Sequence, residues 1–435
     1  MSRTYIKDAS GQVGQSITIK GFVHTLRRQG GISFLIVRDV SGMLQCVVLK
    51  ANETAFATAA DLSHESVVAV TGKVKAEAQA PGGYELEVET IEVLSTADPE
   101  LPIPVVAEKG GGDSNQNARF DHRWIDLRLP EKRNIFKVWT QLERGFRQYW
   151  LENNFIQVYT PAILGAPSES GAEVFTVKYF DREAYLAQSP QFYKQMALAS
   201  GFDRVFMVGP VFRAEPSFTT RHMTEFTGWD FEMAYIDSHH DVMATEEQLL
   251  ISGFKSLEAN IDPEVLGSEF KVPNAPFPKL TMAEAKERLA KAGVPSEKAG
   301  DLSPQEEREI SKIIEEETGS QFVWITDYPI DVRPFYHMRH ADNPGLTKSF
   351  DLLFKGIEIT TGAQREHRHD ILLKQAQEKG MDLELLKFYT DFFKYGCPPH
   401  GGVGMGPNRI IMQLLGLPTV KESAFLPRDV KRINP

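Results

Sequence analysis

The segment formed by residues 204–235 constrains the fold of this 435-residue chain more than any other. It contains two apolar, β-branched runs, residues 205–212 and 231–236, which are typical of buried strands. The polar loop between them carries more charge than a hairpin turn requires. Its Arg213 and Arg221 are permanently charged, planar donors suited to phosphate oxygens. An ordinary solvated loop is the alternative, and this segment alone favours neither interpretation.

Three short motifs along the chain resemble those of a known enzyme family. Residues 212–226 contain Phe-Arg-Ala-Glu followed by Arg-His and Phe, and are similar to motif 2 of class II aminoacyl-tRNA synthetases. Residues 136–161, which end at a proline, resemble motif 1, and residues 404–409 (Gly-Met-Gly-Pro-Asn-Arg) resemble motif 3. The resemblance covers nearly the whole chain and is closest to aspartyl-tRNA synthetases of the archaeal and eukaryotic type.

Composition and charge restrict the class of protein. With 42% hydrophobic residues, the chain has room for two or three domains and a large core. It has no apolar run of membrane-spanning length and no N-terminal segment of the signal-peptide kind, which favours a cytoplasmic protein without membrane contact. Cys46 and Cys397 lie in different predicted domains without metal-ligand spacing, so both are expected to be reduced.

The charge of the chain is unevenly distributed. A formal net charge of −11 argues against indiscriminate nucleic-acid binding. Residues 1–50, however, hold seven Lys or Arg against two Asp. This asymmetry suggests a basic face in the N-terminal region, and uneven surface charge without function is an equal alternative.

The chain is predicted to have an α+β fold with two domains. Short runs bounded by glycine and proline predict five strands in residues 1–100, which suit an OB-fold β-barrel. The five runs are residues 17–24, 32–39, 43–49, 66–74 and 84–93. Residues 101–133 are predicted to form a linker or hinge. Residues 134–435 are predicted to form a class II catalytic domain, an antiparallel sheet flanked by helices.

Two sets of barrel residues carry predictions about tRNA. Arg27, Phe34 and Gln45 match the Arg, aromatic and Gln positions at which the resemblance implies anticodon binding. Phe34 could stack a base and Gln45 could read its edge, although without the family Phe34 would more naturally be barrel core. His24 and Pro81 resemble a pair carried by aspartyl enzymes that also charge tRNA(Asn). An amidotransferase must then convert the resulting Asp-tRNA(Asn).

The helical segments are predicted to be structural. Residues 135–150 carry an apolar face at helical spacing, which fits an ordinary core helix. The resemblance implies that this helix and the strand after it form the interface of a homodimer. A second helix is predicted to begin at a capping box, Ser303 to Glu306. That helix and the segment 281–292 are expected to be peripheral, with no part in the chemistry.

The resemblance implies a pocket for L-aspartate with two cationic walls. Residues 188–195 (Gln-Ser-Pro-Gln-Phe-Tyr-Lys-Gln) match the family's aspartate signature, in which Gln191 and Lys194 contact the substrate. Arg365 matches the arginine that binds the side-chain carboxylate. Two cations favour a carboxylate because the amide of asparagine would present donors to donors. The remaining expected contacts are Glu169, Ser189, Arg213 and Thr361.

The resemblance also implies sites for ATP and Mg²⁺. Arg213 is expected on the α-phosphate and Arg221 on the γ-phosphate, with the adenine between Phe226 and Arg409. The other residues expected to contact ATP are Glu215, His222, Met223, Glu358 and Gly406. The expected metal ligands are Asp351, Glu358 and Thr361. They supply the oxygen donors that Mg²⁺ prefers, and the two acids are expected on one strand and its approach.

The implied reaction needs no protein nucleophile. The α-carboxylate of aspartate attacks the α-phosphorus of ATP, and the terminal adenosine of tRNA(Asp) then accepts the aspartyl group. Arg213, Arg221 and Arg409 are the expected catalytic residues, because they can position phosphates and neutralise developing charge. An asparaginyl-tRNA synthetase, which should not need Lys194, is one alternative. A non-catalytic paralogue that binds tRNA or another nucleic acid is the other.

Overall fold

Five strands in the N-terminal part of the chain close into a barrel in the order β1-β2-β3-β5-β4. Alternate side chains fill its interior, among them the fully buried Ile19, Leu35 and Val70. The strands are β1 (Ser16–Gln29), β2 (Ile32–Arg38), β3 (Met43–Leu49), β4 (Val67–Ala76) and β5 (Tyr84–Ser95). The predicted five-stranded barrel is confirmed, and β1 continues beyond its predicted end to Gln29.

Short helices accompany the barrel in the same part of the chain. They are η1 (Ile6–Gln12), α1 (Glu53–Asp61), η2 (Pro81–Gly83), α2 (Gln116–Asp121) and α3 (Arg123–Asp126). Asn52 caps α1 by accepting a hydrogen bond from the backbone N–H of Ala55. Because α2 and α3 fall in the segment predicted to be a linker, part of that segment is helical.

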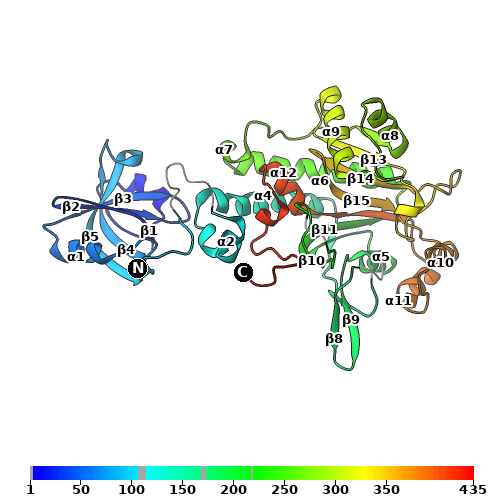
Figure 1. Cartoon of the computed structure of the whole chain (residues 1–435), viewed down its shortest axis with the longest axis horizontal. Coiled ribbons are helices and arrows are strands. Elements are labelled where there is room, and N and C mark those ends of the chain that lie inside the picture. Colours follow the sequence, from blue (N-terminus) through cyan, green and yellow to red (C-terminus); the bar gives the residue numbers. More distant parts are fainter. Residues whose placement is uncertain (1–2, 106–113, 168–172, 217–218) are drawn as a thin grey trace. The chain divides into compact units, whose positions relative to one another are not determined.

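The computed structural model describes residues 3–105, 114–167, 173–216 and 219–435 (Figure 1). The chain divides into two compact units, Met1–Arg128 and Leu129–Pro435. We call them the barrel unit and, after the prediction for residues 134–435, the catalytic unit. Within the described ranges, no helix is both long enough and apolar enough to span a membrane.

The catalytic unit is built on an eight-stranded sheet in the order β12-β13-β14-β15-β16-β11-β10-β6. Its strands are β6 (Ile156–Gln157), β10 (Arg204–Phe212), β11 (Glu225–Ala234), β12 (Lys279–Thr281), β13 (Phe322–Thr326), β14 (Ser349–Phe354), β15 (Ile357–Gln364) and β16 (His400–Met405). Neighbouring strands are antiparallel except for the two edge pairs. The predicted α+β fold with a largely antiparallel sheet is confirmed.

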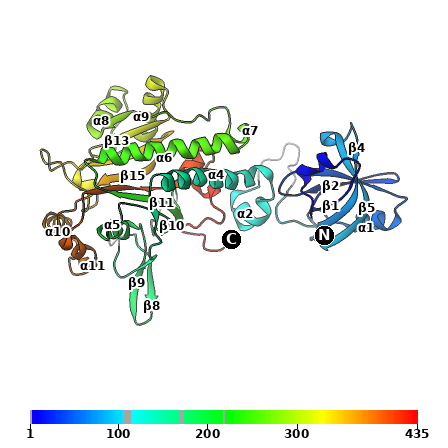
Figure 2. The ribbon, with the colours of Figure 1, turned by 180° about the vertical axis from the view of Figure 1, so that it is seen from behind.

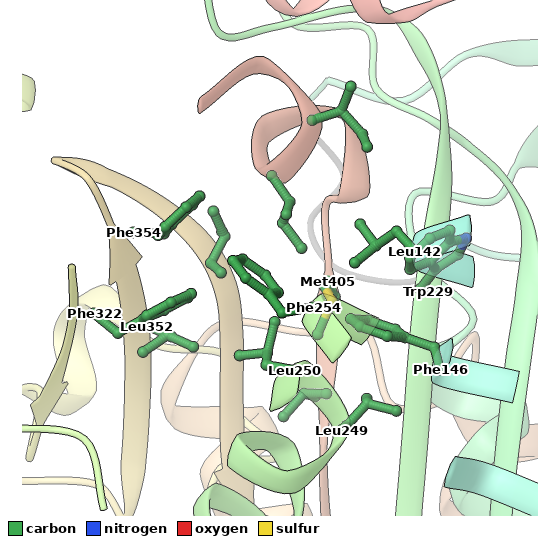
Figure 3. Packing of buried hydrophobic residues seen from close by; sticks show 14 of the residues in the cluster. Leu142, Phe146, Trp229, Leu249, Leu250, Phe254, Phe322, Leu352, Phe354 and Met405 are labelled. Atoms are coloured by element: carbon green, nitrogen blue, oxygen red, sulfur yellow. The ribbon is translucent and has the colours of Figure 1, made fainter. Parts of the chain in front are cut away.

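One face of this sheet packs against α4 (Pro130–Glu152) and α6 (His239–Asn260), which lie side by side (Figure 2). Trp229 of β11 meets Phe146 of α4 edge-on, with ring centroids 5.0 Å apart. Figure 3 shows this packing continuing along α6 to Phe354. Most of the apolar face predicted for α4 therefore belongs to the core. Its buried members are Ile135, Leu142, Phe146 and Trp150.

Smaller elements complete the catalytic unit. Strands β7 (Ile163–Leu164), β8 (Thr176–Tyr179) and β9 (Arg182–Leu186) form a second sheet, from which the β8–β9 hairpin projects (Figure 1). The remaining helices are α5 (Gln191–Ala199), α7 (Pro263–Leu266), α8 (Met282–Lys291), α9 (Pro304–Thr318), η3 (Ile330–Val332), α10 (His369–Glu378), α11 (Lys387–Thr390), η4 (Asp391–Tyr395), α12 (Pro407–Leu414) and η5 (Val420–Ser423). The capping box predicted at Ser303 is confirmed at the start of α9.

The predicted hairpin of residues 204–235 is present, with a shorter loop than expected. Strand β11 begins at Glu225, whereas its apolar run was predicted to begin at Phe231. The added residues include Gly228 and Asp230, which have little preference for strands. They are extended because β10 pairs with them on one side, and Asp230 also pairs with β16 on the other.

Candidate active site

A cavity of about 420 Å³ lies against the face of the main sheet that α4 and α6 leave free. Side chains of β11 alternate across this sheet, so that Trp229 and Phe231 enter the core whereas Gly228 and Asp230 line the cavity. Most residues predicted to bind aspartate or ATP line this one cavity. They are Ser189, Gln191, Lys194, Arg213, Glu215, Arg221, His222, Met223, Phe226, Glu358, Thr361, Arg365, Gly406 and Arg409.

Lys194 of α5 lies at the buried end of the cavity, and 1% of its side chain is exposed. Its Nζ lies 2.9 Å from Oδ2 of Asp230 and 3.3 Å from Oε2 of Glu232, and donates to the carbonyl oxygen of Val403 at 2.8 Å. Because buried charges need partners, these contacts hold the ammonium group in one place. The helix that carries it begins beside Ser189, whose Oγ accepts from the backbone N–H of Gln191.

Arg365 lies beyond the end of β15 and shares a carboxylate with Lys194. Its Nε donates to Oε1 of Glu232 at 2.8 Å, its Nη2 to the carbonyl oxygen of Gly402 at 2.8 Å, and its Nη1 lies 2.9 Å from Nε2 of His337. Burial alone would raise the pKa of Glu232, but Arg365 and Lys194 hold it below its ordinary value. Glu232 is therefore an anion that fixes both cations.

The hairpin loop supplies the other end of the cavity. The guanidinium carbon of Arg213 lies 5.5 Å from the ring centroid of Phe226, a cation–π distance. Arg409, on α12, donates from Nη1 to the carbonyl oxygen of Glu358 at 2.7 Å. Burial, followed by the charges of Arg409 and other neighbouring arginines, lowers the pKa of His222 to about 4. This end of the cavity therefore presents fixed cations and a neutral imidazole.

Arg221 is paired with a carboxylate that none of the sequence motifs contains. Its Nη2 lies 2.8 Å from both carboxylate oxygens of Glu307, on α9. Burial raises the pKa of Glu307 above its ordinary value, and Arg221 opposes that shift. The expectation that α9 is peripheral to the site is wrong, because this helix contacts a cavity residue.

The predicted metal ligands lie on two strands rather than on one strand and its approach. Asp351 is on β14 and Glu358 on β15, and Asp351 faces Thr361 directly across the ladder. The register shifts near Glu358, which allows Glu358 and Thr361, three residues apart, to line the same cavity. Thr361 Oγ1 donates to Oε1 of Glu358 at 3.2 Å.

Asp351 lies beside this pair but does not line the cavity. Its Oδ2 accepts a hydrogen bond of 2.7 Å from Nη2 of Arg333, and both side chains are 9% exposed. Burial raises the pKa of Asp351 while the Arg333 guanidinium opposes the shift. Glu169, predicted to close over the amino acid, lies outside the described residues.

Several charged neighbours of the cavity were missed from the sequence. Asp230 and Glu232 are two apart on β11, and this alternation between apolar residues was a signal that could have placed both on one face. Arg333 and His337 come from irregular chain, which carries no such periodicity. Glu307 lies in a helix with an ordinary amphipathic pattern, which gives no indication of its contact with Arg221.

In the barrel unit, the predicted anticodon residues share one outer face. Arg27 of β1 lies directly opposite Phe34 of β2, and Gln45 of β3 lies opposite Ile36, two residues along from Phe34. Phe34 is half-buried and is not part of the barrel core, so the core alternative for this residue is not supported. Gln45 donates from Nε2 to Oε2 of Glu85 at 2.9 Å.

The residues predicted to set the tRNA range lie elsewhere in the barrel unit. His24 sits where the register of β1 with β2 is interrupted, and its Nδ1 lies 2.9 Å from Nη1 of Arg38. Burial, and then Arg38, lower the pKa of His24, which favours the neutral ring. Pro81 begins the exposed turn η2 between β4 and β5.

Comparison of the sequence with known families gives two matches. The family of class II tRNA synthetases (D, K and N) matches residues 115–430, and the OB-fold nucleic acid binding domain matches residues 17–94. The chain belongs to the class II tRNA synthetases. The family predicted from the three motifs is thus confirmed, and the barrel of this synthetase is of the OB type.

The relatives of this synthetase include enzymes for aspartate and for asparagine. It is 44% identical to the aspartate–tRNA(Asp/Asn) ligase of Aeropyrum pernix, covering 97% of this chain and 96% of that protein. It is 38% identical to the aspartate–tRNA(Asp) ligase of Pyrococcus abyssi, covering 97% of each. The solved structure of asparaginyl-tRNA synthetase from Pyrococcus horikoshii complexed with asparaginyl-adenylate matches it with a TM-score of 0.93 and 33% identity, covering 100% of both chains.

Proposed function

We propose that this synthetase activates L-aspartate with ATP and transfers it to tRNA(Asp). The observation that carries the proposal is the pair of cations Lys194 and Arg365, which line one cavity and are held by the same anion, Glu232. Lysine and arginine offer only donors, so an aspartate carboxylate gains charge-assisted hydrogen bonds that an asparagine amide loses. The relatives named as aspartate ligases support the same choice.

The amino acid is proposed to bind between α5 and β11. Its side-chain carboxylate meets Lys194 and Arg365, while Asp230, which also lines the cavity, offers a carboxylate for the α-ammonium group. The proposed contacts that complete this pocket are Glu169, Ser189, Gln191, Arg213 and Thr361. In this arrangement the α-carboxylate is left to react.

The proposed first step is an in-line displacement at the α-phosphorus of ATP. An oxygen of the aspartate α-carboxylate forms the new bond to phosphorus, and the bond to pyrophosphate breaks. Arg213 binds the α-phosphate and Arg221 the γ-phosphate, so charge that develops on phosphate oxygens meets fixed cations. Arg409 and Phe226 hold the adenine ring. The further proposed ATP contacts are Glu215, His222, Met223, Glu358 and Gly406.

Magnesium fits the oxygen donors beside the proposed phosphate site. Glu358 and Thr361 line the cavity with a carboxylate and a hydroxyl, and Asp351 faces Thr361 across the ladder. Carboxylates together with substrate phosphates are the usual ligands of Mg²⁺ in proteins. When bound there, the ion would neutralise phosphate charge.

In the second step the 3′-hydroxyl of the tRNA's terminal adenosine attacks the aspartyl carbonyl, and AMP leaves.

The choice of amino acid is tested by ATP–pyrophosphate exchange with L-aspartate and L-asparagine in separate reactions. We expect aspartate to support exchange at concentrations at least about 100-fold lower than asparagine, because several charge-assisted bonds differ. Exchange that depends on asparagine would favour the asparaginyl alternative. Absence of exchange with either amino acid would favour the non-catalytic paralogue.

We further propose that tRNA(Asn) is charged with aspartate as well. Relatives named for both tRNAs support this range. His24 supports it too, because Arg38 holds its ring at the place where the register between β1 and β2 is interrupted. The product would require a tRNA-dependent amidotransferase as a partner in the cytoplasm. The test is charging of a tRNA(Asn) transcript by the wild type and by His24→Gln. Charging of tRNA(Asp) by the same variant is the internal control, and a wild type that charges tRNA(Asp) alone would refute this range.

We also propose that the synthetase is a homodimer. Large apolar side chains lie exposed along the chain after α4, where Ile156 is 49%, Tyr159 82% and Ile163 50% exposed. Exposed apolar side chains that gather on one surface mark a contact with a partner. Sedimentation equilibrium should give twice the mass of one chain for the wild type and a lower association constant for Tyr159→Glu. A monomer at micromolar concentration would contradict the proposal.

A further inference from the structure

Glu307 is a buried carboxylate that joins two parts of the proposed ATP site. It lies near the start of α9, and 8% of its side chain is exposed. Besides its contacts with Nη2 of Arg221, its Oε2 accepts a hydrogen bond of 3.2 Å from the backbone N–H of Glu358. One carboxylate therefore connects the hairpin loop, which carries Arg221, with β15, which carries Glu358.

The geometry leaves Arg221 able to bind a second anion. Arg221 and Glu358 line the cavity, whereas Glu307 does not, so Glu307 lies behind the arginine. Both oxygens of Glu307 use Nη2, and among the described residues Nη1 of Arg221 has no hydrogen-bond partner. Arginine has five N–H donors, so a phosphate can bind without displacing the carboxylate.

Fixing Arg221 in advance lowers the cost of binding a phosphate. A free arginine side chain loses rotational freedom when it binds an anion, and this loss opposes association. In this chain the Glu307 contact has already restricted the guanidinium. The same carboxylate restrains the backbone at Glu358, the proposed metal ligand.

We propose that Glu307 is a positioning residue for the triphosphate of the nucleotide, acting through Arg221 and the backbone of Glu358. This inference rests on the proposed function of the cavity as an ATP site. Its consequence is selective. Removing the charge of Glu307 weakens ATP binding and leaves the amino-acid pocket, formed by α5, β11 and Arg365, unchanged.

The test compares two neighbouring variants, Glu307→Gln and Glu306→Gln. Glu306 is also buried, caps α9 and pairs with Lys286 of α8 at 2.6 Å, so its variant reports the general effect of removing a buried carboxylate from this helix. We expect Glu307→Gln to raise the calorimetric dissociation constant of MgATP, and the KM for ATP in pyrophosphate exchange, about tenfold. Glu306→Gln should change the dissociation constant of MgATP and the KM for ATP by no more than about twofold. The KM for aspartate should be unchanged in both variants.

A double variant adds a second check. In an Arg221→Gln background, Glu307→Gln should weaken ATP binding much less than it does in the wild type, because the contact with Arg221 is already lost. The inference is overturned if Glu306→Gln weakens ATP binding as much as Glu307→Gln does. It is also overturned if the KM values for ATP and aspartate rise equally.

The calorimetric titration separates this inference from the proposed function. If ATP binding weakens selectively in Glu307→Gln but the wild type activates no aspartate, the proposed function fails and the role of Glu307 stands. If aspartate is activated and ATP binds Glu307→Gln as tightly as the wild type, only the inference about Glu307 fails.

Discussion

At the scale of single residues, four charged side chains share the buried end of the cavity. Lys194 and Arg365 form ion pairs with Asp230 and Glu232, so the charges of these four side chains cancel. A buried charge whose partner is removed is costly, which makes each of the four sensitive to substitution. An aspartate zwitterion with its side-chain carboxylate can join this network without leaving a donor unmet.

Replacing Lys194 with methionine should impair recognition of aspartate specifically. The variant keeps the length of the side chain but removes one of the two cations. We expect the KM for aspartate in pyrophosphate exchange to rise about 100-fold, with the KM for ATP changed by less than about threefold. Equal increases in both KM values would indicate a general disturbance of the cavity and contradict the proposed role.

Glu246 predicts a dependence of stability on pH. This residue of α6 is fully buried, and burial raises the pKa of its carboxyl to about 8. The folded chain retains this proton where the unfolded chain has released it. Glu246 therefore contributes stability that is full below the ordinary carboxyl pKa and is lost as the pH rises to about 8.

Replacing Glu246 with glutamine should remove that dependence, because the amide stays neutral. As the pH rises from 5 to about 8.5, the melting temperature of Glu246→Gln should rise relative to that of the wild type. The change should correspond to several kcal/mol in the free energy of unfolding. Glu258→Gln, on the exposed side of the same helix, is the control and should show no such shift. A constant difference across this pH range would show that Glu246 is ionised in the folded chain.

At the scale of elements, some strands could be predicted from the sequence and others could not. The barrel strands were predictable because short apolar runs are bounded by glycine and proline. The first half of β11 was not, because Gly228 and Asp230 are extended only through pairing with neighbouring strands. The two-strand arrangement of Asp351 and Glu358 likewise depends on a hairpin turn that spacing alone does not reveal.

The residues of the site could be predicted from the sequence, but the contacts that join them could not. Most of the site residues that the motifs supplied line the cavity. They gave no indication that Glu232 joins Lys194 to Arg365, or that Glu307 joins Arg221 to β15. Such links are contacts between segments far apart in the chain, and local patterns of sequence do not encode them.

The contact between α4 and α6 predicts a strict requirement for glycine. A Cβ added at Gly145 would lie 2.5 Å from the carbonyl oxygen of Ser252 and 2.7 Å from Cα of Gly253. Gly145→Ala must therefore separate the two helices, and we expect it to lower the free energy of unfolding by about 1–3 kcal/mol. Chemical denaturation measures this effect. Gly165→Ala, which would meet no atom within 4 Å, is the control, and an equal loss in both variants would contradict this account.

At the scale of the whole molecule, the two units are proposed to divide the reaction between them. The cavity and its charged network belong to the catalytic unit, whereas the aromatic and polar residues proposed to meet the anticodon belong to the barrel unit. Activation of aspartate should therefore depend on the catalytic unit alone. Transfer to tRNA should depend on both.

Phe34→Ala tests this division. Loss of one stacked base costs about 1–3 kcal/mol, so the KM for tRNA in aminoacylation should rise about tenfold or more. Pyrophosphate exchange, which needs no tRNA, should be unchanged. Val13→Ala, a substitution at an exposed position outside the barrel strands, is the control for general effects on this unit. An equal fall in exchange and aminoacylation would contradict the division.

The most direct test of the central claim is aminoacylation of a tRNA(Asp) transcript with radiolabelled L-aspartate, ATP and Mg²⁺. Aspartyl-tRNA(Asp) should accumulate, and no labelled product should form when labelled asparagine replaces aspartate. Transfer of asparagine, or no transfer of either amino acid by a chain that folds and binds tRNA, would contradict it.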